Sequence, residues 1–328
     1  MKEPNLFKFA TSELSQDAFI CWLLSWADPK YKTIDKNLHQ CGIKLIESFF
    51  TKHKKFLPSS LTKIEVIKQD SYIDVLCIIN DEYVILIEDK TWTKAHGDQL
   101  KRYLAEIKDR SYKEENILPI YFKTRDQASY ENIEKEGYKT FLRNDFLKIL
   151  NFGNNLGIEN AIFQDFRKHL QSISDAVASY LVLPIKDWHR NSWIGFYLKL
   201  QEELATGNWD YVSNPSGGFL GFWWGFQKDS NCRQYLQLEQ KKFCIKVEVN
   251  HIADRRKLRN ENYQRMKLKF SGFKKPSRFG NGTYMTILIN KEEYRKVNAD
   301  GTLNIEKTVA YLKKVADSLK TINKKENI

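Results

Sequence analysis

The sequence has few cysteines and lacks several features that would assign it to common protein classes. Its five cysteines are scattered over 328 residues and form no Cys-x-x-Cys pair, which excludes a disulfide framework and a zinc site of the usual spacing. No run approaches 18 uncharged apolar residues, so no membrane span is expected. No Gly-x-x-x-x-Gly-Lys-Ser/Thr loop is present, so any motor acting with this chain would be a partner protein.

The start of the chain also lacks the apolar region of a signal peptide, because Glu3 and Pro4 stand there. Together with the reduced cysteines, this predicts a cytoplasmic protein. A hydrophobic content of 42% and a charged content of 29% are ordinary for a globular protein. The length is sufficient for two domains, which we predict at residues 1–184 and 185–328.

Acidic residues are scarce relative to basic ones, and the net charge is +12. Residues 251–280 alone contain ten Lys or Arg against two acids, with Tyr263, Phe270 and Phe273 interleaved. Such a segment can simply be a solvated face, but localised charge with aromatic residues also suits phosphate contacts with some base stacking. The candidate nucleic-acid-binding residues are Arg255, Arg256, Lys257, Arg259, Lys274, Lys275 and Arg278.

Residues 72–90 read as two apolar, β-branched runs joined by a short polar turn. If Ile79 and Tyr83 flank a three-residue loop, antiparallel pairing places Asp74 opposite Glu88, with Cβ atoms about 5 Å apart. Alternation then puts Lys90 on the face of Glu88. Charged strand ends are common, but two facing carboxylates repel each other unless a cation lies between them. The pattern therefore predicts a divalent metal site.

Helices and strands surround this hairpin in a mixed order. The first half reads as helices at 11–24 and 35–54, a strand at 62–69, the hairpin, a helix at 94–108, and strands at 116–122 and 138–142. The 94–108 helix carries Gln99 and Tyr103 at an i, i+4 spacing, although this spacing also suits a surface helix. A Gly/Asn loop is expected at 151–157, and a helix at 158–183.

The second half contains expected helices at 188–204 and 305–319 and strands at 235–238, 243–249 and 284–289. The aromatic stretch 222–224 is interpreted as core or an oligomer interface more than as a stacking platform. The fold class is α/β (α+β), with a mixed central sheet flanked by helices and a second α+β domain that is aromatic-rich and basic and serves nucleic-acid binding or assembly.

The sequence Asp74-(x)n-Glu88-x-Lys90 followed by Gln99-x-x-x-Tyr103 resembles the PD-(D/E)XK nuclease superfamily, with a site of the RecB and lambda exonuclease type. The segment 13–17 also resembles that of a poorly characterised bacterial family of this superfamily. One departure is Ile73, which stands where a proline often precedes the aspartate. The resemblance implies the restriction-endonuclease-like αβββαβ core.

The resemblance also implies the site chemistry. Asp74, Glu88 and the backbone carbonyl of Asp89 would hold Mg²⁺, or Mn²⁺ in its place, and Lys90 would position or activate a water molecule. Glu13 would be a provisional additional acid, although a helix N-terminus favours acids by its dipole alone. Gln99 and Tyr103 would contact DNA or the other active-site groups. The Asp89 side chain is expected to point to the opposite face.

The predicted function is metal-dependent hydrolysis of phosphodiester bonds in nucleic acid, with DNA favoured. Two alternatives stay open at this point. One is a non-catalytic nucleic-acid-binding or assembly protein on a nuclease fold, and the other is a defence effector nuclease gated by a partner. The oligomeric state is also open, with a homodimer or a partner protein both possible from the sequence.

Overall fold

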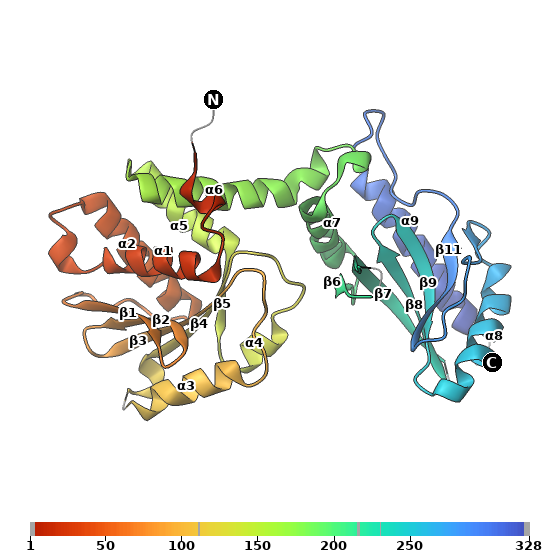
Figure 1. Ribbon diagram of the computed structural model, residues 1–328, viewed down its shortest axis with the longest axis horizontal. Helices are drawn as coiled ribbons and strands as arrows, with labels where there is room; N and C mark the ends of the chain where they lie inside the picture. Colours follow the sequence, from red (N-terminus) through yellow and green to blue (C-terminus); the bar gives the residue numbers. More distant parts are fainter. Residues whose placement is uncertain (1–3, 111, 215–216, 230, 325–328) are drawn as a thin grey trace. The chain divides into compact units, whose positions relative to one another are not determined.

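The computed structural model describes residues 4–110, 112–214, 217–229 and 231–324. Its chain divides into two units, Met1–Asp175 and Ala176–Ile328, each with its own sheet (Figure 1). The boundary falls within one long helix, α6 (Ala161–Ala178). None of the helices in the described ranges has both the length and the apolar character needed to cross a bilayer.

The first unit is built on a five-stranded mixed sheet with the strand order β1-β2-β3-β4-β5. The first three strands pair antiparallel, and β3, β4 and β5 pair parallel. The strands are β1 (Ile64–Asp70), β2 (Ile73–Ile79), β3 (Tyr83–Lys90), β4 (Ile117–Lys123) and β5 (Lys139–Leu142). This mixed α+β architecture confirms the predicted fold class.

Helices cover both faces of this sheet, with α1 and α2 on one side and α3 on the other (Figure 1). The helices of this unit are α1 (Glu13–Ser25), α2 (Lys36–Lys52), α3 (Gln99–Asp109), α4 (Glu131–Lys135), α5 (Arg143–Asn155) and α6. Because β3 and β4 are covered on both faces, their sequences are nearly continuous apolar runs. Polar groups in these strands are confined to the ends, and β3 carries its charges at residues 88–90.

The expected loop at 151–157 is wrong for most of its length, because helix α5 continues to Asn155. Gly153 lies inside this helix rather than at a turn. A Cβ atom there would come within 2.8 Å of Phe163, Cys41 and Ile158. The glycine therefore allows close packing of helices. The turn was predicted only because the segment 151–157 is rich in glycine and asparagine.

The second unit holds a six-stranded sheet with the order β10-β11-β9-β8-β7-β6, in which all pairs are antiparallel. Its strands are β6 (Asn208–Val212), β7 (Phe219–Asp229), β8 (Cys232–Glu239), β9 (Lys242–Glu248), β10 (Phe273–Lys274) and β11 (Tyr284–Asn290). Its helices are α7 (Arg190–Glu203), α8 (Arg255–Lys267) and α9 (Ile305–Lys324). The β6 and β7 strands and α8 were not assigned from the sequence.

The aromatic stretch 222–224 is divided between the two faces of β7. Phe222 and Trp224 are buried in the core, where Trp224 stacks on Phe243 at 5.5 Å between ring centroids. Trp223 is half-buried and lines a cavity on the other face. Strand alternation causes this division. Phe222 and Trp224 are therefore core residues, whereas Trp223 is not, and the alternative of an oligomer interface stays a prediction for it.

Candidate functional site

The β2–β3 hairpin has the register expected from its loop length. Ile79 pairs with Tyr83, and the ladder continues to the pair Val75 and Ile87. One step further along, the backbone N–H of Asp89 donates to Asp74 Oδ2 at 2.8 Å. This hydrogen bond fixes the Asp74 side chain at the end of β3, beside the backbone that carries Glu88 and Lys90.

The Lys90 ammonium is the centre around which the predicted acids gather. Its Nζ lies 2.5 Å from Glu88 Oε1, 3.5 Å from Asp74 Oδ2 and 4.0 Å from Glu13 Oε2. It also donates to the backbone carbonyl of Asp89 at 2.8 Å. The structure therefore brings together the four groups that were predicted from sequence as metal ligands.

Glu13 reaches this cluster from the first turn of α1, and its carboxylate has a more specific environment than a helix terminus provides. Its Oε1 accepts from the backbone N–H of Thr91 at 3.0 Å and from the Thr93 hydroxyl at 2.6 Å. Burial alone would raise the pKa of Glu13, but these hydrogen bonds and Lys90 lower it below its ordinary value. The residue is held as an ionised group.

The electrostatics of the site are strongly coupled. Burial, followed by the charge of Asp74, raises the pKa of Glu88 to about 7. Burial would lower the pKa of Lys90, but Glu88, Asp74 and Glu13 together raise it above its ordinary value. A carboxyl with a raised pKa beside a further carboxylate is typical of a functional site.

The donor set suits a divalent cation. Within the described ranges, no three Asp, Glu, His or Cys side chains form a group that could hold a metal by themselves. The Lys90 ammonium lies among the carboxylates. All of the converging groups are oxygen donors, which Mg²⁺ prefers. The fully buried Glu88 Oε2 accepts no hydrogen bond from any group that the structure describes, as expected of an atom that serves as a ligand.

Gln99 and Tyr103 belong to α3, which covers the same face of the sheet as the acids. Tyr103 is buried against this face together with Leu76 and Leu86, which lie two residues from Asp74 and Glu88 and therefore on the same face of the sheet. The Gln99 amide donates to the Tyr103 hydroxyl at 3.0 Å. The i, i+4 pair is therefore a physical contact, and its role toward a substrate stays a prediction.

Lys123 was missed by the sequence reasoning. It ends the buried strand β4 and pairs in parallel register with Lys90. Its Nζ donates to the carbonyls of Thr91 and Thr93 at 2.9 and 2.6 Å, and burial lowers its pKa to about 8. It thus holds the segment that positions Glu13. The available signal was a charged residue at the carboxyl end of a buried parallel strand, where sites form.

The Asp89 side chain points away from the acids, as predicted, and lies in a buried polar chain. The Thr124 hydroxyl donates to the Gln16 amide oxygen, and the Gln16 amide donates to Asp89 Oδ1, both at 2.5 Å. Among the described residues, no group donates a hydrogen bond to Asp17 Oδ1 or Asp89 Oδ2. The two carboxyls interact with each other, and one proton shared between them would satisfy both oxygen atoms. Burial, then the charge of Asp17, raises the pKa of Asp89 well above its ordinary value.

We expect Asp17→Asn to stabilise the protein at alkaline pH. Burial, with a contribution from Asp74, raises the pKa of Asp17 from 3.8 to about 6. Between these values the folded chain holds a proton that the unfolded chain has lost, so the free energy of unfolding falls as the pH rises. The amide removes this loss, and urea unfolding without divalent cations should show a gain of about 1–3 kcal/mol at pH 8.

The matched control is Asp28→Asn. Burial would raise the pKa of Asp28, but the backbone N–H groups of Lys30 and Ile64 lower it below its ordinary value. Its stabilisation is present above the unfolded pKa and is lost on acidification, so this variant should be less stable at pH 8. An Asp17→Asn variant that unfolds as easily as the Asp28→Asn variant would contradict the shared-proton arrangement.

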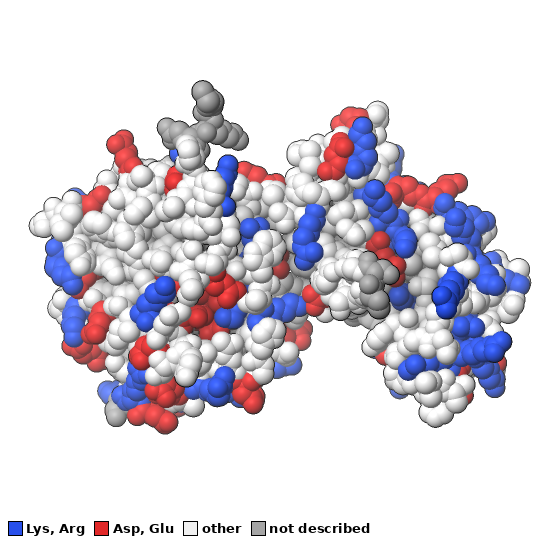
Figure 2. Space-filling model, in the orientation of Figure 1, with Lys and Arg blue, Asp and Glu red and all other residues white. Residues whose placement is uncertain are grey.

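The basic segment lies on and after α8, where Lys and Arg side chains gather on the face shown in Figure 2. Two of the predicted binding residues are engaged within the protein. Arg255 donates to the carbonyl of Val249 and the hydroxyl of Thr283, and the buried Arg259 donates to the carbonyl of Gly280. The exposed members of the predicted set are Arg256, Lys257, Lys274, Lys275 and Arg278.

The sheet is mixed and covered by helices, and the ends of two of its paired strands carry an Asp, a Glu and a Lys. This combination is typical of a nuclease fold. The family model described as the PD-(D/E)XK nuclease superfamily matches residues 4–184, which is more than half of the chain. The chain therefore belongs to the PD-(D/E)XK nuclease superfamily. A search of curated proteins found no significant match, and a search of solved structures also found none.

Proposed function

We propose that this protein is a metal-dependent nuclease that hydrolyses phosphodiester bonds of DNA. The observation that carries the proposal is the convergence of three carboxylates and one backbone carbonyl on the Lys90 ammonium. Mg²⁺ bound by these oxygens would supply Lewis-acid chemistry, namely neutralisation of the phosphate charge and a lower pKa for an attacking water molecule.

The chain's own residues would perform three tasks. Asp74, Glu88, Glu13 and the Asp89 carbonyl would hold the cation. The Lys90 ammonium, which is rooted on the Asp89 carbonyl, would donate hydrogen bonds to the water or to the phosphate oxygens and offset their charge. Gln99 and Tyr103, which are hydrogen-bonded to each other on α3, would contact the nucleic acid from the side of the site where α3 lies.

The substrate is proposed to be DNA because of the superfamily resemblance and the exposed cations of the second unit. Arg256, Lys257, Lys274, Lys275 and Arg278 would contact the phosphate backbone, which gives affinity without reading the sequence of bases. A defence effector gated by a partner is compatible with the same site. In that case the isolated chain would bind Mg²⁺ but cleave only after its partner is added.

The experiment is a cleavage assay on circular and linear, single- and double-stranded DNA, with RNA of the same sequence alongside. We expect DNA cleavage with Mg²⁺ or Mn²⁺ and none with EDTA, and cutting of closed circles would exclude an enzyme that acts only from ends. Calorimetric titration with Mn²⁺ separates the alternatives, because a non-catalytic relative need not bind the metal. Undiminished cleavage in EDTA, or cleavage of RNA alone, would contradict the proposal.

A further inference from the structure

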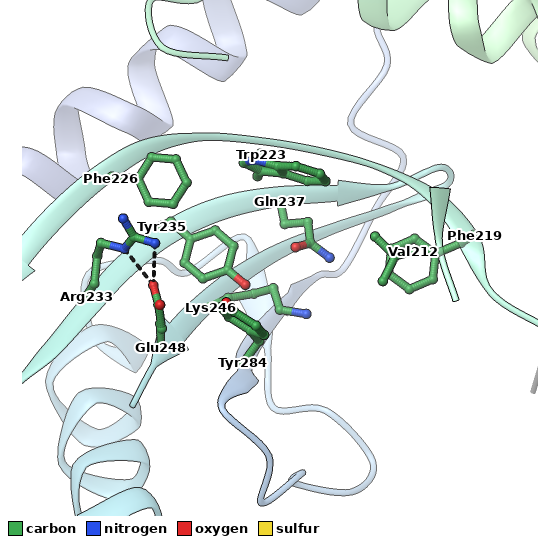
Figure 3. A pocket seen from close by; sticks show the side chains of 10 residues that line it. All are labelled: Val212, Phe219, Trp223, Phe226, Arg233, Tyr235, Gln237, Lys246, Glu248 and Tyr284. Atoms are coloured by element: carbon green, nitrogen blue, oxygen red, sulfur yellow. Dashed lines mark hydrogen bonds and ion pairs between the residues drawn. The ribbon is translucent and has the colours of Figure 1, made fainter. Parts of the chain in front are cut away.

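The second unit has a cavity of 450 Å³ on the face of its sheet that lies opposite its helices (Figure 3). Strand alternation brings Trp223 of β7, Tyr235 and Gln237 of β8, Lys246 of β9 and Tyr284 of β11 to this face. The buried side chains through which α7 and α8 meet the sheet lie on the other face. These helices therefore do not cover the cavity, and its volume suits a small planar ligand.

The walls of the cavity are flat aromatic surfaces. Phe226 and Tyr235 are stacked, with ring centroids 5.3 Å apart, and the Arg233 guanidinium lies over Phe226 at 4.5 Å. Trp223 is half-buried and Tyr284 is 61% exposed, so both rings are accessible to a further planar group. Aromatic and guanidinium faces of this kind stack on nucleic-acid bases of any sequence.

The charges inside the cavity are already matched. Arg233 pairs with Glu248 at 2.6 Å, and Lys246 pairs with Glu239 at 3.2 Å. A phosphate group would have to compete with these carboxylates, so the interior is unsuited to an anion. The Gln237 amide extends into the cavity (Figure 3) and donates to Glu239 Oε1 at 3.1 Å, so its oxygen suits a donor on the neutral polar edge of a planar ring.

The basic segment begins beside the strand that carries Tyr284. Arg255, at the start of α8, donates to Thr283 Oγ1 at 2.8 Å, and Thr283 directly precedes the cavity residue Tyr284. Arg256 and Lys257 follow on α8 and are exposed. Phosphates would therefore be favoured beside the cavity and a neutral ring inside it, which is the arrangement of a strand that inserts one unpaired base.

We propose that this cavity binds an unpaired base of single-stranded nucleic acid, by stacking on Trp223 and Tyr284, while the phosphates of the nucleic acid contact the cations at the start of α8. This inference rests on the proposed function only in taking nucleic acid as the ligand. It assigns to the second unit a preference for single-stranded over double-stranded nucleic acid. This unit lies largely beyond the residues matched by the superfamily model.

The test measures binding of the full chain to a fluorescent single-stranded 20-mer by anisotropy, in EDTA so that cleavage does not contribute. Tyr284→Ala and Trp223→Ala should each weaken binding roughly 5- to 100-fold, and Tyr284→Phe should bind like wild type because it keeps the ring. The matched control is Phe56→Ala, since Phe56 is an aromatic residue that is 97% exposed on the first unit. Tyr284 is exposed, so its replacement tests the site without endangering the fold.

Binding to a duplex of the same sequence should be unchanged in these variants, because its bases are already stacked. Wild-type affinity of both alanine variants for the single strand would overturn the proposal, and so would equal weakening of duplex binding. A free nucleoside monophosphate that binds as tightly as the 20-mer would also overturn it, because the occupant would then not belong to a strand. Cleavage does not enter the measurement, so an inactive protein that binds the strand would contradict only the proposed function.

Discussion

Replacing Asp74 with Asn should lower the rate of metal-dependent DNA cleavage by about 10²- to 10⁴-fold, because one anionic ligand is lost and a cation contributes several kcal/mol to such reactions. The amide oxygen can still accept from the backbone N–H of Asp89, so the strand end should keep its geometry. Calorimetry should show Mn²⁺ affinity reduced by at least about tenfold, since a neutral oxygen binds a divalent cation more weakly than a carboxylate.

Asp81→Asn is the matched control for this variant. Asp81 lies in the turn of the same hairpin, is exposed and pairs with Lys63, so its amide variant should cleave and bind Mn²⁺ like wild type. If Asp74→Asn retained both full cleavage and full Mn²⁺ affinity, the carboxylate cluster would not be the catalytic centre.

Replacing Lys90 with Met should also lower cleavage, by about 10²- to 10³-fold, because a hydrogen-bond donor aimed at developing charge is removed. Its effect on the metal should be the opposite of that of Asp74→Asn. The ammonium lies 2.5 Å from Glu88 and 3.5 Å from Asp74, where it competes with a bound cation. Mn²⁺ affinity should therefore be unchanged or higher in the Lys90→Met variant.

Thermal unfolding gives a second measurement for the same variant. Without the ammonium, three carboxylates face one another, so the metal-free Lys90→Met variant should be less stable than wild type and should gain more stability from Mg²⁺. The control is Lys63→Met, which removes an exposed lysine preceding β1. Normal cleavage by the Lys90→Met variant would show that Lys90 has no part in the proposed chemistry.

The local part of the site could be predicted from the sequence. The register between Asp74 and Glu88 follows from the length of the turn and the two-residue period of a strand, and the Gln99–Tyr103 contact follows from the helical period. These relations join residues of two consecutive strands or of one helix, so short-range geometry is enough to fix them. The mixed α+β class followed from the order of the same elements.

Other features could not be predicted because local periodicity carries no information about them. Gly153 looks like a turn residue but permits close helix packing, since the atoms that crowd it belong to distant segments. The charge of residues 251–280 made Arg259 a candidate for binding nucleic acid, yet its side chain is buried and donates to the carbonyl of Gly280. Composition counts charges, whereas only packing decides which of them reach solvent.

The sequence by itself determined that Asp74, Glu88 and Lys90 share one end of a hairpin, because turn length and strand alternation leave little freedom there. Only the tertiary structure decided that Glu13 joins them through Thr91 and Thr93, and that Lys123 holds this segment. It also decided that the β7, β8, β9 and β11 strands present an open aromatic cavity. These contacts join residues that are far apart in the chain, and their formation depends on which sheets and helices pack together.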